Sequence, residues 1–309
     1  MTMPALIRCL LVMALCAPAS AWAQIAKGTL ELKPLPPLAN PKDPKLPAKE
    51  LFGRKAAAAP LAARAIGFYA KGCLAGALAL PVNGKTWQVM RLSRNRNWGH
   101  PTLVKLIERV ADLGAKAGWP GLLVGDISQP RGGPMLTGHT SHQVGLDADL
   151  WLTPMPKREL TRQEREEMSA IQTVRDDRLD VNPTVWTSQH TSIIKIAAEQ
   201  PEVARIFVNA AIKKALCRDA GKDRRWLSKV RPYYGHDYHF HIRIHCPNGS
   251  ADCEAQASVP ADDGCGKELA YWFSDAILHP KPPKVPPKPK PPIKLADLPA
   301  ACRTVLTAP

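Results

Sequence analysis

The sequence has few aromatic residues and lacks several familiar motifs. Phe, Trp and Tyr make up only 6% of the 309 residues, which disfavours a single-stranded nucleic-acid binder because such proteins stack bases on aromatic side chains. Beyond the N-terminal segment, no apolar run is long enough to span a membrane. There is no H-E-x-x-H motif, which carries the glutamate base of the common zinc proteases. There is also no C-x-x-C pair, which disfavours a cysteine-only zinc site.

The N-terminus has the three parts of a secretory signal peptide. Arg8 precedes an apolar run from Cys9 to Ala17, and Ala21-Trp22-Ala23 forms a small-x-small cleavage site. We therefore expect residues 1–23 to be a signal peptide that is cleaved after Ala23. The mature chain is expected to be exported to the periplasm.

The cysteine count is even after this cleavage. Removing Cys9 and Cys16 from the 8 cysteines leaves six. In an oxidising compartment, an even set predicts three disulfides, although the sequence alone leaves many connectivities open. The pair Cys246 and Cys253 is the easiest to close because Pro247, Asn248 and Gly249 lie between them.

The chain is strongly basic. It has 42 Lys and Arg against 27 Asp and Glu, a formal charge of +15, and loss of Arg8 leaves 41 against 27, or +14. This excess favours an anionic partner such as nucleic acid, lipid headgroups or an acidic cell-wall polymer. Because export and the low aromatic content disfavour nucleic acid, we expect a cell-wall polymer as partner. We expect no nucleic-acid partner and no transmembrane segment in the mature chain.

Composition divides the mature chain into three parts. Residues 24–67 are rich in Pro, Lys and Ala and predict an extended lead-in. Residues 68–278 have the mixed pattern of one globular domain. Residues 279–309 begin with a cationic proline-rich segment and extend past Cys302. A disulfide from Cys302 to the body would strap this tail to the surface.

Helical and strand-like patterns alternate within residues 68–278. Apolar residues at helical spacing predict helices around 103–113 and 193–197, and Thr161 with Glu164 predicts the capped start of a charged helix running towards Val174. Short strands are expected at residues 122–124, 146–152, 205–208 and 239–244. This mixed order predicts an α+β fold, with a small antiparallel sheet flanked by helices and long loops tied by three disulfides.

The last of these strands carries histidines on one face. His239, His241 and Arg243 would share that face, while every second residue from Phe240 to Ile244 is apolar and faces the core. Imidazoles at positions where Thr, Ser or Lys would serve solubility better indicate a metal site or an acid–base site on a rigid strand.

A second polar cluster lies between Gly138 and Leu152. Residues 146–152 alternate apolar side chains with Asp147, Asp149 and Trp151, which predicts a strand with two carboxylates on its outer face. His142 stands just before this strand, so the chain can bring an imidazole next to Asp149.

Together, the two clusters offer a ligand set for a metal ion. His142, Asp149 and His241 supply two nitrogens and one oxygen, which is typical of a catalytic zinc site. His239, one pleat from His241, is then available as a proton shuttle or electrostatic stabiliser. His236 fits a substrate contact and a turn equally well, and we expect Asp147 to orient a ligand rather than to be one. A lone histidine on a strand is usually solvated, but two such clusters in one domain favour the metal site.

These stretches resemble a known family, the penicillin-insensitive murein endopeptidases, which are zinc peptidases grouped with lysostaphin-type enzymes and D-Ala-D-Ala metallopeptidases. The shared pattern is His-x6-Asp, here His142 to Asp149, followed far downstream by His-x-His, here His239 to His241. The similarity extends from about Cys73 to Cys302. Further matching segments are Val89-Met-Arg91, Gly99-His-Pro101, Arg205-Ile-Phe-Val-Asn209 and Cys246-Pro247.

The resemblance implies roles for individual residues. It implies that His142, Asp149 and His241 bind the catalytic zinc ion, that His239 is the catalytic histidine, and that His236 lines the site. It also implies the disulfides Cys73–Cys302, Cys217–Cys265 and Cys246–Cys253.

The resemblance further implies extra metal contacts from His139 and from an aspartate, either Asp176 or, with a different gap placement, Asp177. Relatives have a histidine at the same extra position, and this sequence has none there. We therefore expect one catalytic zinc ion and not a second.

The implied activity is hydrolysis of the D-alanyl–meso-diaminopimelate cross-links of peptidoglycan, without sensitivity to β-lactams. Two alternatives stay open: a zinc D,D-carboxypeptidase or dipeptidase that trims stem peptides, and a non-catalytic cell-wall-binding protein. Ser192-Ile-Ile-Lys195 matches the S-x-x-K of penicillin-binding enzymes, but no Lys-Thr-Gly follows, so a serine mechanism is disfavoured. The sequence leaves the oligomeric state open.

Overall fold

The computed structural model describes residues 27–283, 285–286 and 288–309. The expected signal peptide, residues 1–23, lies outside this part of the chain. The described residues have the α+β fold that the sequence predicts. None of their helices is both long and apolar enough to cross a bilayer.

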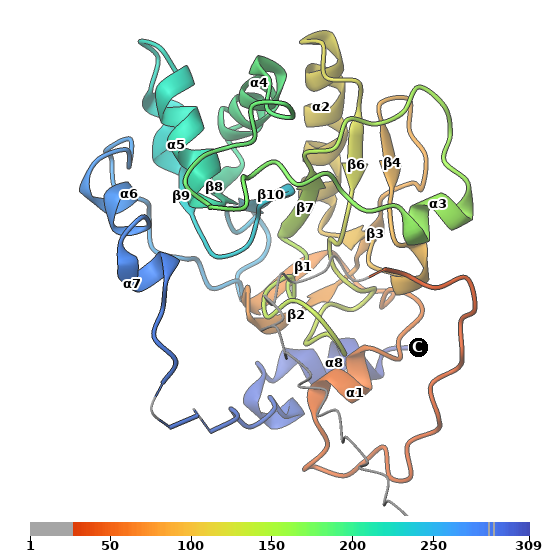
Figure 1. Cartoon of the computed structure of the whole chain (residues 1–309). Coiled ribbons are helices and arrows are strands. Elements are labelled where there is room, and N and C mark those ends of the chain that lie inside the picture. The colour runs from red at the N-terminus through yellow and green to blue at the C-terminus, as the bar shows by residue number, and fades with distance from the viewer. Residues whose placement is uncertain (1–26, 284, 287) are drawn as a thin grey trace, which may run out of the picture.

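A six-stranded sheet forms the centre of the molecule (Figure 1). Its four inner strands are antiparallel neighbours, and each edge strand runs parallel to the strand beside it. The predicted antiparallel sheet is therefore the middle of a larger mixed sheet. In spatial order the strands are β4 (Trp87–Val89), β6 (Leu122–Val124), β7 (Asp147–Trp151), β10 (His239–Ile244), β8 (Val203–Val208) and β9 (Val230–Pro232).

Helices cover the apolar face of this sheet. The main core joins residues of β7, β8 and β10 to those of α2 (Pro101–Lys116), α4 (Ser188–Ala198) and α5 (Ala210–Asp219). Phe240, Ile242 and Ile244 of β10 lie in this core and are fully buried. Because every second side chain of β10 is held by the core, the alternate side chains are fixed on the opposite face.

The capped helix is shorter than expected. Thr161 and Glu164 form the predicted capping box, and α3 runs from Arg162 to Glu167. The chain does not continue as a helix to Val174, because the Thr173 N–H donates to the Asp237 carbonyl (2.9 Å). Backbone groups after Glu167 thus bond to another segment in place of a helical partner.

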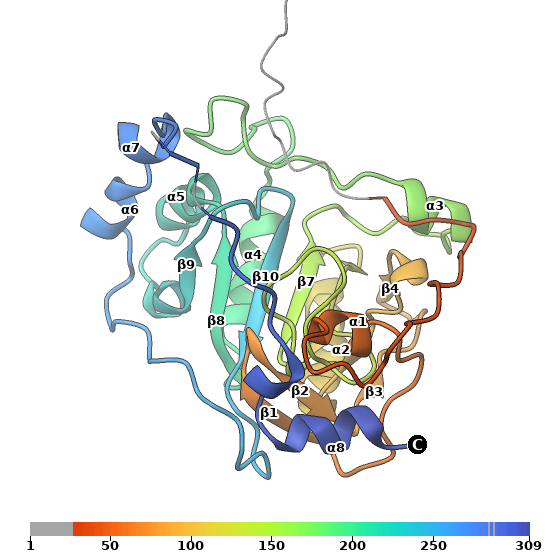
Figure 2. The same cartoon turned by 90° about the horizontal axis from the view of Figure 1, so that it is seen from below.

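Segments from both ends of the described chain form a second, smaller core. Figures 1 and 2 show α1 (Ala48–Phe52) beside α8 (Ala301–Thr307), both near the hairpin of β1 (Arg64–Phe68) and β2 (Lys71–Ala75). Buried side chains from these elements pack together. The expected lead-in, residues 24–67, thus contains a short helix and most of β1. The remaining short elements are β3 (Leu78–Ala79), β5 (Trp98–Gly99), α6 (Lys267–Tyr271) and α7 (Asp275–Leu278), with 3₁₀ turns at Leu92–Arg94, Arg225–Lys229 and Leu295–Asp297.

The C-terminal tail is fastened to the body at two points. Cys302 on α8 forms a disulfide with Cys73 on β2. The Arg131 guanidinium donates to carbonyl oxygens at the end of the chain, including those of Ala308 (2.6 Å) and Pro309 (2.7 Å). These contacts satisfy carbonyl groups that the last helical turn leaves without a partner.

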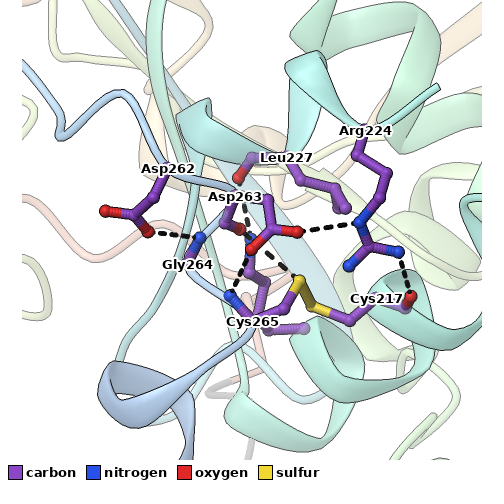
Figure 3. The surroundings of a disulfide bond; sticks show 8 residues. Cys217, Arg224, Leu227, Asp262, Asp263, Gly264 and Cys265 are labelled. Atoms are coloured by element: carbon purple, nitrogen blue, oxygen red, sulfur yellow. Dashed lines mark hydrogen bonds and ion pairs between the residues drawn. A yellow bond between two sulfur atoms is a disulfide. The ribbon is translucent and has the colours of Figure 1, made fainter. Parts of the chain in front are cut away.

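The other two disulfides link Cys246 to Cys253 and Cys217 to Cys265. All three pairs are those that the family resemblance implies. Around Cys217–Cys265, Arg224 donates to the Asp263 carboxylate (2.8 Å) and to the Cys217 carbonyl (2.8 Å), as Figure 3 shows. The fully buried Lys213 donates to the carbonyls of Leu227 and Asp263. This network holds the segment before α6 against α5.

Candidate metal centre

The histidine face of β10 is buried, although we expected it to face solvent. His239, His241 and Arg243 expose only 7%, 4% and 7% of their surface. Loops cover this face of the sheet, including the segment that carries His142. Buried imidazoles and carboxylates need partners, so the contacts of each side chain indicate what the site can hold.

His142 presents one ring nitrogen to the centre of the site. Its Nδ1 lies 2.6 Å from the carbonyl oxygen of Ile127. Because a carbonyl only accepts, Nδ1 carries the hydrogen and Nε2 carries the lone pair. That Nε2 is buried and has no hydrogen-bond partner among the described residues. His142 has a left-handed backbone (φ 66°), a strained conformation for a residue other than glycine that is common at functional sites.

Asp149 on β7 lies at the middle of the cluster. Its Oδ1 is 3.5 Å from Nε2 of His142 and 3.1 Å from Nδ1 of His241, yet this oxygen is buried and makes no hydrogen bond to any residue that the structure describes. Burial opposes ionisation, but the imidazoles of His239, His142 and His139 outweigh it and hold the pKa of this carboxyl well below its usual range. Asp149 is therefore an ionised carboxylate surrounded by nitrogens.

His241 pairs with Asp149 across the β7–β10 ladder. Its Nε2 lies 3.0 Å from Oδ1 of Asp147, so Nδ1 faces Asp149. Burial alone would lower the pKa of His241, but Asp147 and Asp149 together raise it. The Asp147–His241 bond has the form of the carboxylate–histidine contacts that orient metal ligands in proteins.

Asp147 connects several parts of the site. It is fully buried and accepts hydrogen bonds from Arg243 Nε (2.7 Å), Arg243 Nη2 (3.2 Å) and the backbone N–H of His142 (3.1 Å), besides that of His241. The structure thus places Asp147 as an orienting partner, as the sequence suggested. Arg243 in turn stacks on Tyr69, with its Cζ 4.0 Å from the ring centroid.

His139 lies beside the cluster in the loop before His142. Its Nε2 is 3.1 Å from Oδ2 of Asp126 and 3.5 Å from Oδ2 of Asp149. Asp126 also pairs with Arg94 (3.0 Å) and Arg96 (2.8 Å). The sequence reasoning missed Asp126, although its position in the loop after the buried strand at residues 122–124, one residue beyond Gly125, is a typical place for a functional side chain.

The candidate ligands form two overlapping sets. Among the described residues, those with ligand atoms all within 4.8 Å of one another are His139, His142 and Asp149. His241 adjoins this set through its 3.1 Å contact with Asp149. Asp176 is on an exposed turn, and neither it nor Asp177 is part of this cluster.

His239 and His236 line the same site. Nε2 of His239 lies 3.5 Å from Oδ1 of Asp149, and its Nδ1 is buried with no hydrogen-bond partner in the described part of the chain. Burial and the neighbouring His241 lower the pKa of His239 to about 4, although Asp149 opposes this shift. The ring of His236 contacts that of His239 in a tilted arrangement, with 4.8 Å between ring centroids, and its Nδ1 contacts the Tyr234 carbonyl (2.8 Å). His236 stands in a turn (φ 57°) and also lines the site. The two roles suggested by the sequence, a turn residue and a substrate contact, are therefore compatible.

Residues of the cluster line two cavities. One, of about 420 Å³, is lined by His139, His236 and His239. The other, of about 730 Å³, is lined by His139, His236 and His241. The two cavities adjoin at His139 and His236, so a chain-like ligand that occupies both passes the cluster.

The donor set fits a metal ion. Nε2 of His142 and Oδ1 of Asp149, both buried and without a hydrogen bond among the described residues, lie 3.5 Å apart, and cations satisfy such lone pairs. A buried group of imidazoles and an ionised carboxylate that borders two cavities is typical of the metal-dependent hydrolases.

Comparison with known proteins identifies the family. The family model for penicillin-insensitive murein endopeptidases matches residues 65–307. The chain is 46% identical over 244 residues to the enzyme of that name from Haemophilus influenzae, covering 79% of this chain and 82% of the relative. The relative from Klebsiella pneumoniae is 44% identical over 244 residues (79% and 86%), and that from Yersinia enterocolitica is 45% identical over 229 residues (74% and 83%). The chain belongs to this family and is a peptidase, as the resemblance implied.

Proposed function

We propose that this protein is a periplasmic zinc endopeptidase that hydrolyses the D-alanyl–meso-diaminopimelate cross-links of peptidoglycan. The names of its relatives support murein as the substrate. The observation that carries the proposal is the approach of Nε2 of His142 (3.5 Å) and Nδ1 of His241 (3.1 Å) to Oδ1 of Asp149. Of these atoms, His142 Nε2 and Asp149 Oδ1 are buried without a hydrogen bond among the described residues. The basic charge of the chain suits an anionic polymer.

The zinc ligands in this proposal are Nε2 of His142, Oδ1 of Asp149 and Nδ1 of His241. His142 and His241 each bond through their other ring nitrogen to a fixed acceptor, which leaves the correct nitrogen for the metal. Zinc, when bound, supplies Lewis-acid polarisation of an amide carbonyl and lowers the pKa of a water molecule to about 7.

His239 is the proposed catalytic histidine. Its imidazole is neutral near pH 7 because burial keeps its pKa near 4, so its ring can donate one hydrogen bond and accept another. In this position it stabilises charge that develops on the scissile carbonyl oxygen or passes a proton to the leaving nitrogen. His236 lines the wall beside it and restricts where the peptide lies.

The two cavities favour an endopeptidase over a D,D-carboxypeptidase. An enzyme that cuts inside a cross-link must accept chain on both sides of the scissile bond, whereas one that trims stem ends needs room on one side only. Digestion of purified cross-linked muropeptide dimers tests this directly. We expect monomers to form without prior release of D-Ala; intact dimers together with free D-Ala would support the carboxypeptidase instead.

The basic tail favours a second function beside cleavage, the binding of the cell wall. Two variants separate binding from catalysis: His241→Ala, and a tail in which Lys281, Lys288 and Lys290 are changed to Gln. The proposed enzyme loses dimer cleavage in the first variant and retains it in the second. A purely binding protein shows the reverse, with sacculus binding lost only in the second.

Export is part of the proposal. Three disulfides suit an oxidising compartment. Mass spectrometry of the protein from a periplasmic extract should give a mature N-terminus at Gln24. A retained Met1 would contradict the proposed signal peptide.

A further inference from the structure

The larger of the two cavities is lined by arginines as well as by histidines of the site. His139, His236 and His241 line it together with Arg205, Arg231 and Arg243, and Gln256 and Ala257 lie on its loop side. A concave surface of one charge concentrates ligands of the opposite charge. Glu268 is the one carboxylate among the described residues of this lining, so the three arginines leave an excess of positive charge that favours an anionic group close to the histidines.

Strand register places these arginines on the histidine face of the sheet. Asp149, His241, Phe207 and Arg231 stand opposite one another across β7, β10, β8 and β9. The next row on the same face holds Asp147, Arg243 and Arg205. Residues two apart on one strand are separated by roughly 6–7 Å, so Arg205 lies within one side-chain length of the His241 row.

The Phe207 ring connects Arg205 to the site. Its centroid is 6.0 Å from Cζ of Arg205 and 5.3 Å from the ring of His241. The same ring contacts Arg243, with Cζ at 5.2 Å. The Arg205 guanidinium thus lies near the Phe207 ring, which also contacts His241, one of the proposed zinc ligands.

Two of the three arginines already have carboxylate partners. Arg231 pairs with Glu268. Arg243 bonds to Asp147 and to Gln256 Oε1 (2.8 Å). Arg205 makes a hydrogen bond to the Ala257 carbonyl (2.8 Å), and no carboxylate of the described residues lies within ion-pair distance of it. Arg205 is therefore the arginine of this cavity whose positive charge has no carboxylate partner among the described residues.

The surroundings of Arg205 disfavour the charged form of its side chain. Burial, followed by the guanidinium groups of Arg243 and Arg231, lowers the pKa of Arg205. A carboxylate bound in the cavity would offset both the burial and the repulsion, and a guanidinium can hold it through two parallel hydrogen bonds.

We propose that Arg205 binds the free carboxylate of the substrate that lies next to the scissile bond. This inference rests on the proposed function. In the D-alanyl–meso-diaminopimelate cross-link, that carboxylate is on the carbon that bears the scissile nitrogen. With its carboxylate at Arg205, the diaminopimelate residue occupies the larger cavity, and the D-alanyl side extends past His239 into the smaller one.

The test compares two muropeptide dimers that differ only in this group, one with the free carboxylate and one with a carboxamide in its place. We expect the wild-type protein to cleave the amidated dimer with a kcat/KM about 10- to 100-fold lower, as for loss of a charged hydrogen bond. Arg205→Ala should cleave the carboxylate dimer about as slowly as the wild type cleaves the amide, and should not distinguish the two dimers. Arg205→Lys should keep part of the discrimination.

Arg225→Ala serves as the matched control, because Arg225 is exposed and outside this cavity. It should leave both rates unchanged. An equal loss of activity on both dimers in Arg205→Ala would mean a structural role and would overturn the inference, as would equal cleavage of both dimers by the wild type. Failure of the wild type to cleave either dimer would overturn the proposed function and this inference with it.

Discussion

Replacement of Asp147 by Asn tests how the site is held together. Asp147 is fully buried and accepts hydrogen bonds from Arg243, from His241 and from the His142 backbone. Asn has the same shape, but its amide group donates where a second acceptor oxygen stood. In Asp147→Asn, the buried Arg243 charge therefore loses its ionic partner, and one of the surrounding donors faces another donor.

The expected losses follow from these contacts. Removing one member of a buried ion pair costs about 3–5 kcal/mol, and the retained amide oxygen places Asp147→Asn at the low end, about 3 kcal/mol. Because His241 loses its orienting carboxylate, zinc affinity should fall by about 10- to 100-fold. Urea unfolding of the metal-loaded and metal-free protein measures the loss of stability, and competition with a chromophoric chelator measures the zinc affinity.

Asp252→Asn provides the matched control. Asp252 pairs with Arg64 at 3.3 Å, but both side chains are well exposed, so its loss should change stability by less than about 1 kcal/mol and leave zinc affinity unchanged. If Asp147→Asn kept wild-type zinc affinity and unfolded like Asp252→Asn, the orienting role of Asp147 would be refuted.

Three further predictions address the ligands, the tail and pH. His241→Ala should abolish stoichiometric zinc binding in metal analysis, whereas His139→Ala should retain about one zinc per chain; the opposite ranking would assign the ion to the His139–His142–Asp149 set. Cys302→Ser, which opens the Cys73–Cys302 disulfide, should cost about 2–5 kcal/mol in urea unfolding, and an unchanged midpoint would mean that the tail adds nothing to stability. Burial lowers the pKa of Lys213 to about 7, so the unfolded chain binds more protons above that pH, and stability should rise by about 2 kcal/mol from pH 7 to pH 9. Lys213→Met should lack this increase, and equal slopes for both proteins would contradict the shift.

Periodicity predicted the elements that carry the site. The strand at residues 122–124 and the histidine strand have the predicted bounds, and the strand at residues 146–152 is observed one residue shorter at each end. The two longer strands were recognised by their apolar alternation, which also gives their faces. The strand at residues 122–124 was recognised as a short apolar run after Gly118, Pro120 and Gly121. The family resemblance added the three disulfide pairings, which cysteine spacing alone left open.

The environment of the site could not be predicted in the same way. The burial of His239 and His241 depends on loops that carry no periodic signal, and the role of Asp126 depends on Arg94 and Arg96, which are far from it in sequence. The end of the helix at Glu167 was missed because the competing hydrogen bond comes from Asp237, 64 residues beyond Thr173. Non-local contacts of this kind decide the chemistry of a site, and local patterns do not contain them.

The most direct test of the central claim is mass-spectrometric analysis of cross-linked muropeptide dimers incubated with the purified, zinc-loaded protein, with and without a chelator. The account predicts conversion of dimers to monomers without release of D-Ala, abolished by the chelator and restored by zinc. Cleavage that continues at full rate in the chelated protein, or release of D-Ala from dimers that stay cross-linked, would contradict it.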